Sequence, residues 1–249
     1  MTSSASTPAS HANADFGRTR WSLVLAVRSG SESQARGSLA DLCRRYWVPV
    51  YAYVRRCGHG AEGAAALTQS FLSEVVQHIR QHDPSAAGGF RQFLQEQLEL
   101  FLASDWTRLE VAAPLDEFAP PWPLPQIEER QRREQPPQAS PAQAFERAFA
   151  LEMLAQALAQ LQQEAQEAGR GQLYEALQPY LTRDPGPGEY ADLAQRTRSS
   201  PLATVVAVKR LRQRYQELID AQLAQTVGGR SAFEVERQAL LAVLEAPSP

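Results

Sequence analysis

The chain has 249 residues, of which 43% are hydrophobic, and a formal net charge of −3. A chain of this length and apolar content can bury one or two ordinary cores, and the length favours two. The mild charge excludes a global attraction to nucleic acid, so any DNA contact must come from a local basic patch. Two cysteines are too few for a disulfide framework or a zinc cage.

Residues 1–17 are predicted to form a disordered tail, because their Ser, Thr, Ala and Pro side chains offer little that packs. They lack the basic start and the apolar core of a signal peptide, and no later run reaches the ~18 apolar residues of a membrane span. Together with the sparse cysteines, these features predict a cytoplasmic protein with no membrane partner.

Residues 18–110 carry helical apolar spacing throughout and are predicted to form a lobe of four helices. The helix-ending signals within this range are Gly30, the CGHG at 57–60 and the DPSAAGG at 83–89. No alternating strand pattern competes with this interpretation.

The third of these helices begins AEGAAALTQSFL over residues 61–72 and has an unusual outer face. At about 100° per residue, its buried side collects Ala64, Leu67, Thr68, Phe71, Val75 and Ile79. The opposite side collects Glu62, Gly63, Ala66, Gln69, Ser70, Ser73 and Gln77. These outer residues are mostly small or neutral where a solvated helix usually alternates charges, so the outer face calls for an explanation.

Residues 111–141 contain eight prolines and are predicted to be a linker. Prolines at this density disfavour continuous helix and favour an extended, semi-rigid chain. The stretch IEERQRREQ within it has helical character but too little apolar surface to fold alone. We expect this segment to hold the flanking lobes apart.

Residues 142–226 are predicted to form a second helical lobe. Ser140 caps and Pro141 opens a long amphipathic helix that ends at Gly169. The helix QLYEALQPYL, the breaker RDPGPG and a short helix EYADLAQRT follow, and then a long basic helix starts after Ser200. Residues 227–249 are predicted to form an extension with one more helix, SAFEVERQALLAVL, and a tail. The predicted fold is therefore all-α, with two helical lobes joined by a Pro-rich linker.

The stretch EYADLAQRTRSSPLATVVAVKRLRQRY has the shape of a helix-turn-helix. Its expected interior residues are Leu193, Ala194, Val206, Ala207 and Leu211. Its second helix carries a basic tract made of Lys209, Arg210, Arg212 and Arg214. A tract of this kind is as often a solvated face as a phosphate-binding one, so the motif by itself is only moderately specific.

No sequence motif supports an enzyme, because the chain has no glycine-rich phosphate loop, no paired acids and no nucleophile–base arrangement. His78 and His82 stand four residues apart beside Asp83, a spacing that suits a metal. Histidines in the last turn of a helix are already explained by the helix dipole. We therefore expect a protein that is not an enzyme and that holds neither a cofactor nor a metal.

The order of parts resembles the extracytoplasmic-function class of sigma factors of bacterial RNA polymerase, over residues 18–243. The pieces that carry the resemblance are TRWSLVLAVR, LCRRYWVPVYAYVRRCG, LTQSFL, FRQFL, FLASDW, SPAQAFERAFALEMLAQAL, LYEALQPYL, YADLAQR and KRLRQRYQELIDAQLAQTV. No single piece is decisive, and the resemblance rests on their shared order and spacing.

The resemblance implies a first lobe that grips the polymerase core and a second lobe that reads promoter DNA. The implied polymerase contacts are Glu62, Gln69, Ser70 and Phe71. The implied DNA contacts are Trp106, Arg108, Arg198, Lys209, Arg210, Arg212 and Arg214. Several acids expected on the helix at 61–72 are replaced here by Gly63, Ala65, Ala66 and Ser70, which predicts weak binding to the polymerase.

A subgroup of this class that is paired with Ser/Thr kinases suggests how the lost charge is restored. A phosphate adds about −1.5 to −2 charge, so phosphorylation of Ser70 or Thr68 would replace two carboxylates. Ser70 is favoured by its outward phase and Thr68 by its place in the LTQSFL motif. The alternative is a sigma-like adaptor or antagonist that no longer initiates transcription, because basic residues are missing from both lobes.

Overall fold

The computed structural model describes residues 43–78, 90–104, 118–227 and 229–245. All regular elements in these ranges are helices, which confirms the all-α class for this part of the chain. None of the described helices is long and apolar enough to span a bilayer. The predicted tail at 1–17, the first helix of the first lobe, and Trp106 and Arg108 lie outside the described residues.

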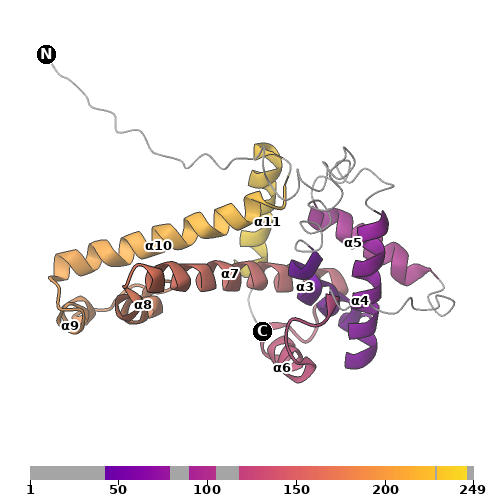
Figure 1. The fold of residues 1–249 in the computed structure, drawn as a ribbon, viewed down its shortest axis with the longest axis horizontal. Helices are drawn as coiled ribbons and strands as arrows, with labels where there is room; N and C mark the ends of the chain where they lie inside the picture. The colour runs from indigo at the N-terminus through magenta and orange to yellow at the C-terminus, as the bar shows by residue number, and fades with distance from the viewer. Residues whose placement is uncertain (1–42, 79–89, 105–117, 228, 246–249) are drawn as a thin grey trace, which may run out of the picture.

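The body of the molecule is built on α3 (Trp47–Arg56), α4 (Ala61–His78) and α5 (Phe90–Ala103) (Figure 1). Helix α3 is central, because all but its last two residues are buried. Its chain leaves the helix through Gly58, which adopts φ 98° and so turns back toward α4. The aromatic ring of Tyr46 stacks on Phe149 with centroids 5.0 Å apart, and Trp47 stacks on Tyr51 at 5.1 Å. These rings form the centre of the main core.

The Pro-rich segment folds against the body over residues 118–140 and contains α6 (Leu124–Glu134) (Figure 1). Ile127 is 1% exposed and belongs to the main core. The Nε1–H of Trp47 donates to the carbonyl of Phe118 at 2.9 Å, and Arg55 makes a bidentate ion pair with Glu128 at 2.8 and 2.7 Å. The extended spacer predicted for this segment is therefore wrong over the described residues 118–140.

The physical reason is the placement of the prolines. Pro123 and Pro125 stand at the start of α6, where a missing N–H costs nothing. Pro136 and Pro137 follow its end, and their carbonyls accept hydrogen bonds from the Arg56 guanidinium. The prolines therefore delimit a short helix, and packing on α3 supplies the apolar burial that this helix lacks in isolation.

Helix α7 (Pro141–Glu167) begins as predicted, with Ser140 and Gln143 forming a reciprocal capping box and Pro141 in the first turn. It ends before Gly169, which adopts φ 66°. The first half of α7 lies inside the main core through Phe145, Phe149 and Met153. This helix was expected to begin a separate second lobe, but its first half is part of the body.

The second half of α7 extends away from the body and pairs with α10 (Pro201–Ala224), which runs back in the opposite direction (Figure 1). We call this pair and its outer end the arm. The outer end consists of α8 (Gly171–Leu177), the short 3₁₀ helix η6 (Gln178–Tyr180) and α9 (Glu189–Arg196). Helix α11 (Arg230–Glu245) packs on α7 and α10 where the arm meets the body.

Polar contacts reinforce this junction. The Arg91 guanidinium in α5 pairs with Glu236 in α11 at 2.7 Å and also with Glu146 in α7. Leu223 and Leu240 add the ends of α10 and α11 to the main core. Body and arm therefore share one hydrophobic core at the junction.

Candidate nucleic-acid interface and partner surface

The helix-turn-helix lies at the outer end of the arm. Gly188 adopts φ 86° immediately before α9, whose Glu189 carboxylate pairs with Arg183 at 2.7 Å and accepts from the Gly186 N–H. These contacts, with the Arg183 hydrogen bonds first, lower the pKa of Glu189 to about 2. The entry to α9 is therefore fixed by a charge that persists at neutral pH.

The turn between α9 and α10 is made by residues 197–200. The Thr197 hydroxyl donates to the Leu193 carbonyl at 2.8 Å, and Arg198 adopts the left-handed region with φ 51°. Ser200 then caps α10 by accepting from the Ala203 N–H at 3.2 Å, and Pro201 occupies the first turn. The side chain of Arg198 is exposed.

The interior of this motif differs in part from the prediction. Leu193 and Ala194 are buried as expected, but the fully buried residues on the first turns of α10 are Thr204 and Val208. Val206 is 40% exposed, so its predicted interior position is wrong, whereas Ala207 and Leu211 are half-buried at the edge of the cluster. Thr204 is tolerated inside because its hydroxyl lies 2.9 Å from the Ser199 hydroxyl and 3.1 Å from the Ser200 carbonyl oxygen.

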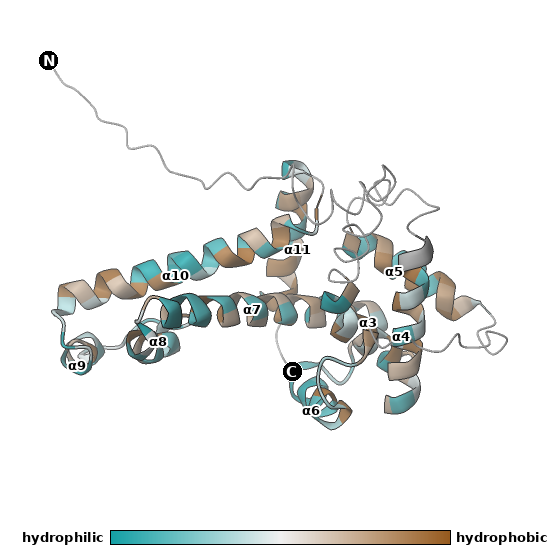
Figure 2. Ribbon diagram, in the orientation of Figure 1, coloured by the Kyte–Doolittle hydropathy of each residue, from teal (hydrophilic) through white to brown (hydrophobic). Residues whose placement is uncertain are grey.

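The first turns of α10 consequently present apolar side chains outward. Leu202 is 74% exposed and Val205 is 39% exposed, and Figure 2 shows the hydrophobic start of α10 followed by a hydrophilic middle. Such side chains contact thymine methyl groups or another protein, but they do not hydrogen-bond to base edges.

The basic tract divides into two free cations and two that are neutralised within the fold. Arg212 donates to the carbonyls of Tyr180 and Arg183 and pairs with Asp184 at 2.7 Å. Arg214 makes a bidentate pair with Glu164 at 2.8 Å, and its hydrogen bonds lower the pKa of that carboxyl.

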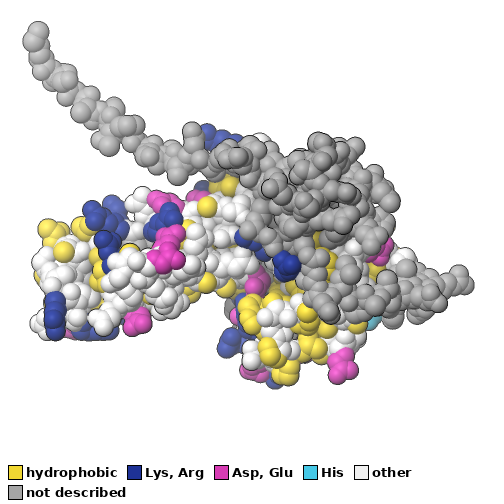
Figure 3. Space-filling view, in the orientation of Figure 1, with side chains coloured by type: hydrophobic (Ala, Val, Ile, Leu, Met, Phe, Trp, Pro, Cys, Tyr) yellow, Lys and Arg dark blue, Asp and Glu magenta, His cyan; other side chains and the backbone are white. Residues whose placement is uncertain are grey.

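Lys209 and Arg210 are exposed, as is Arg198, and these three side chains make no ion pair in the part of the chain that the structure describes. Figure 3 shows basic side chains gathered over the outer part of the arm. The sequence alone did not distinguish Lys209 and Arg210 from Arg212 and Arg214. The carboxylates of Asp184 and Glu164, which pair with Arg212 and Arg214, lie 28 and 50 residues away from them in the chain.

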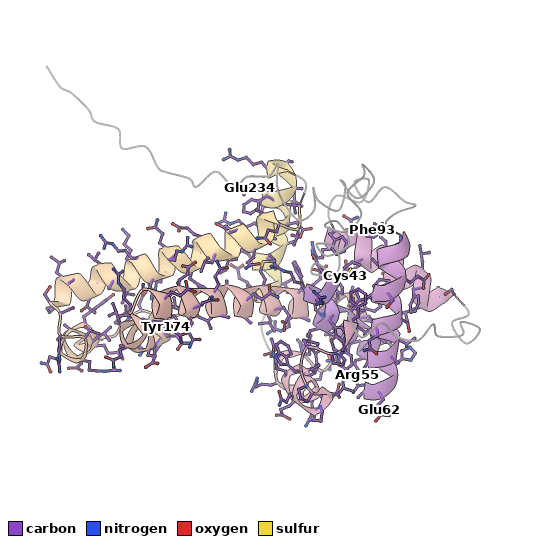
Figure 4. The ribbon with its side chains drawn as sticks, in the orientation of Figure 1. Cys43, Arg55, Glu62, Phe93, Tyr174 and Glu234 are labelled. Carbon is purple, nitrogen blue, oxygen red and sulfur yellow. The ribbon has the colours of Figure 1, made fainter. Side chains whose placement is uncertain are left out.

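A groove of about 800 Å³ lies beside the helix-turn-helix, between the outer half of α7, α8 and the start of α10. Its walls are mainly apolar, and the cations Arg170 and Arg210 stand among its lining residues. The Tyr174 hydroxyl is enclosed there without a hydrogen-bond partner among the described residues, and burial raises its pKa. Figure 4 shows Tyr174 at the outer end of the arm, near α8. The exposure of Leu202 and Val205 was not predicted because the run PLATVVAV has no clear helical phase, and no local motif marked Arg170.

The outer face of α4 is exposed at Glu62, Gly63 and Ala66, as predicted, and Figure 4 shows Glu62 at the end of this helix. Gln69 is half-buried. Phe71 is 1% exposed and packs on Phe101 with ring centroids 5.5 Å apart. Phe71 is therefore a core residue, and its predicted role as a direct polymerase contact is wrong for this conformation.

The two hydroxyls considered for phosphorylation are both inaccessible. Thr68 is 0% exposed and its hydroxyl donates to the Ala64 carbonyl at 2.7 Å. Ser70 is half-buried, and its hydroxyl oxygen is enclosed without a partner among the described residues. The outward direction predicted for the Ser70 hydroxyl is thus wrong, because helical phase alone does not show which neighbouring elements cover a residue.

Within the described ranges, no group of three or more metal-ligating side chains comes together. The suggested histidine pair is not covered by this statement, because His82 and the His78 side chain lie outside the described residues.

Comparison with known proteins found no family model, no curated protein and no solved structure that matches this chain. The resemblance to sigma factors therefore rests on the sequence motifs quoted above.

Proposed function

We propose that this chain is a sigma-like transcription protein that contacts DNA through the outer end of the arm. The observation that carries the proposal is the α9–turn–α10 motif, in which Arg198, Lys209 and Arg210 are exposed and unpaired among the described residues. Free cations on a protruding helix pair suit DNA phosphates, which attract positive charge regardless of sequence. The order of the sequence motifs supplies the sigma-factor part of the proposal.

The proposed partner of the body is the bacterial RNA polymerase core, met by the outer face of α4. Over residues 61–72 that face carries a single carboxylate, Glu62, beside Gly63 and Ala66. Charged contacts of partly buried pairs raise both association rate and specificity, so a face this poor in charge binds weakly. Acidic substitutions Gly63→Asp and Ala66→Asp are expected to strengthen binding in a pull-down with core polymerase.

Activation by a Ser/Thr kinase remains part of the proposal, on the condition that α4 first moves away from the elements that cover its hydroxyl groups. Because the hydroxyls of Thr68 and Ser70 are enclosed, a kinase reaches them only after α4 has moved from its neighbours. The proposal for DNA contact does not depend on this step.

A second candidate function is an adaptor or antagonist that binds other proteins and no longer directs transcription. The apolar surface of Leu202, Val205 and Val206 favours it, since exposed apolar patches mark protein contacts. The neutralisation of Arg212 and Arg214 favours it as well, because it leaves fewer cations for DNA.

One experiment distinguishes these two candidate functions. It measures binding to double-stranded DNA as a function of salt concentration, by fluorescence anisotropy. Lys209→Ala together with Arg210→Ala should weaken binding to every sequence and reduce the slope of log K against log salt by about 2, which is the value for two lost phosphate contacts. Arg132→Ala with Arg133→Ala on α6 is the matched control, because it removes the same charge from exposed positions of the body. An unchanged slope for the first variant rejects DNA contact and leaves the adaptor.

A further inference from the structure

Three hydrophobic clusters lie in series along the arm and are joined by shared residues. The main core takes in the first half of α7. The middle cluster contains Ala157, Leu161, Tyr174 and Leu218, and the tip cluster contains Leu177, Tyr180, Leu193 and Val208. Ile219 packs against both the main core and the middle cluster, and Leu211 packs against both the middle and the tip clusters. The apolar packing is therefore continuous from the body to the helix-turn-helix.

Polar side chains tie the same elements together. At the base of the arm, Gln222 of α10 accepts from Arg45 and donates to Gln160 of α7 at 3.2 Å. Farther out, Arg214 and Glu164 link α10 to α7 by two hydrogen bonds of 2.8 Å. These contacts restrain sliding of α10 along α7.

The two long helices are also unbroken. Neither α7 after Pro141 nor α10 after Pro201 contains proline or glycine, the usual causes of a kink. Between Leu223 in the main core and Ser200 at the turn, α10 rises by ~34 Å at 1.5 Å per residue.

We infer that the arm is a rigid spacer that holds the helix-turn-helix at a fixed distance and rotation from the outer face of α4. The rigidity follows from the continuous packing, whereas the identity of the two surfaces as DNA and polymerase contacts rests on the proposed function. A partner that meets both surfaces must then present its sites at the spacing that the arm sets. The connection between the two surfaces is therefore a packed helical arm, whereas the proline content predicted an extended, semi-rigid linker.

The middle cluster is the section of this spacer that joins the body to the tip, and its four buried residues are as few as those of the tip cluster and far fewer than those of the main core. Truncating Leu161 and Leu218 removes the largest aliphatic side chains from it. The tip cluster is left intact by this change, so the helix-turn-helix keeps its own packing.

The test measures the distance distribution between spin labels at Glu62→Cys and Gln195→Cys by double electron–electron resonance, in the full chain. Both positions are exposed, and Cys57→Ser removes the exposed cysteine while Cys43 stays buried. We expect one narrow distribution for this protein. The pair Leu161→Ala and Leu218→Ala should widen it, whereas Leu202→Ala, an exposed leucine on the same arm, should not.

A broad or multiple distribution in the labelled protein without further substitution would overturn the inference, and so would an unchanged width in the double variant. Circular dichroism checks that the double variant is still helical, and if it is not, Leu218→Val replaces it. Because this measurement uses neither DNA nor polymerase, its failure is distinct from a failure of the proposed function. If the arm is rigid and the helix-turn-helix also contacts DNA, the Leu161→Ala and Leu218→Ala variant should keep the slope of log K against log salt, because the tip cluster is unchanged.

Discussion

Replacing Ile127 by alanine measures whether the Pro-rich segment is part of the folded core. Ile127 is 1% exposed and lies in the main core with the rings of Trp47 and Tyr51. The substitution removes three carbon atoms, each worth about 0.8 kcal/mol of burial, and leaves a cavity, so the free energy of unfolding should fall by about 3 kcal/mol. In a domain of this size, that loss corresponds to a melting temperature lower by roughly 6–12 °C.

The assay is urea unfolding followed by both far-ultraviolet circular dichroism and tryptophan fluorescence. Because body and arm share a core, we expect the two probes to report one transition, displaced to lower urea in the variant. Val235→Ala is the control, since Val235 is 66% exposed on α11 and surface changes of this kind stay within about 0.5 kcal/mol. An Ile127→Ala variant as stable as this control would refute the packed segment and restore the extended spacer.

Three further predictions concern substitutions at single positions. The bidentate hydrogen bonds of Arg55 lower the pKa of the Glu128 carboxyl, so this pair adds stability above the ordinary carboxyl pKa and loses it as the pH falls through the lowered value. Glu128→Gln should therefore cost about 2 kcal/mol at pH 7, and urea unfolding at a series of pH values should show this difference shrinking below about pH 4; a constant difference would contradict the ion pair. Thr68→Val should change stability by less than about 1 kcal/mol, whereas Thr68→Glu should cost more than about 3 kcal/mol because it buries an unpaired charge; thermal melting checks both, and a tolerated glutamate would show that the site opens easily. Gly58→Ala should destabilise by about 1 kcal/mol because of its φ of 98°, while Gly63→Ala on the exposed face of α4 should stabilise by about 0.5–1 kcal/mol, and equal effects of the two in urea would reject this assignment of backbone strain.

The candidate interface was predictable where the signal is local. The glycine and serine residues that bound α9 and α10, and the burial of Leu193 and Ala194, follow from capping chemistry and helical phase. The interior of α10 was not predictable, because PLATVVAV offers several apolar phases and the buried position goes to Thr204, whose hydroxyl finds partners in the turn. A polar residue is predicted to be exposed unless the hydrogen bonds that would satisfy it in the interior are known.

Ion pairs with residues from other parts of the chain determine which members of the basic tract are available to bind DNA. Lys209, Arg210, Arg212 and Arg214 are alike in sequence, yet two of them are neutralised by Asp184 and Glu164. The accessibility of Ser70 was likewise decided by its surroundings and not by its phase on α4.

Local signals along the chain were enough to place the ends of several helices, because capping residues, glycines of positive φ and prolines act on their nearest neighbours. Ser140, Pro141 and Gly169 define α7 with no reference to the rest of the chain. Which helices share a core could not be predicted from local signals. The burial of Ile127 and the insertion of Phe145 and Phe149 among the rings of the body depend on apolar contacts between residues far apart in the chain. Prolines were a local signal for breaks in helices, but whether a broken segment packs depends on the surface that the fold offers it, and only the assembled body provides that surface.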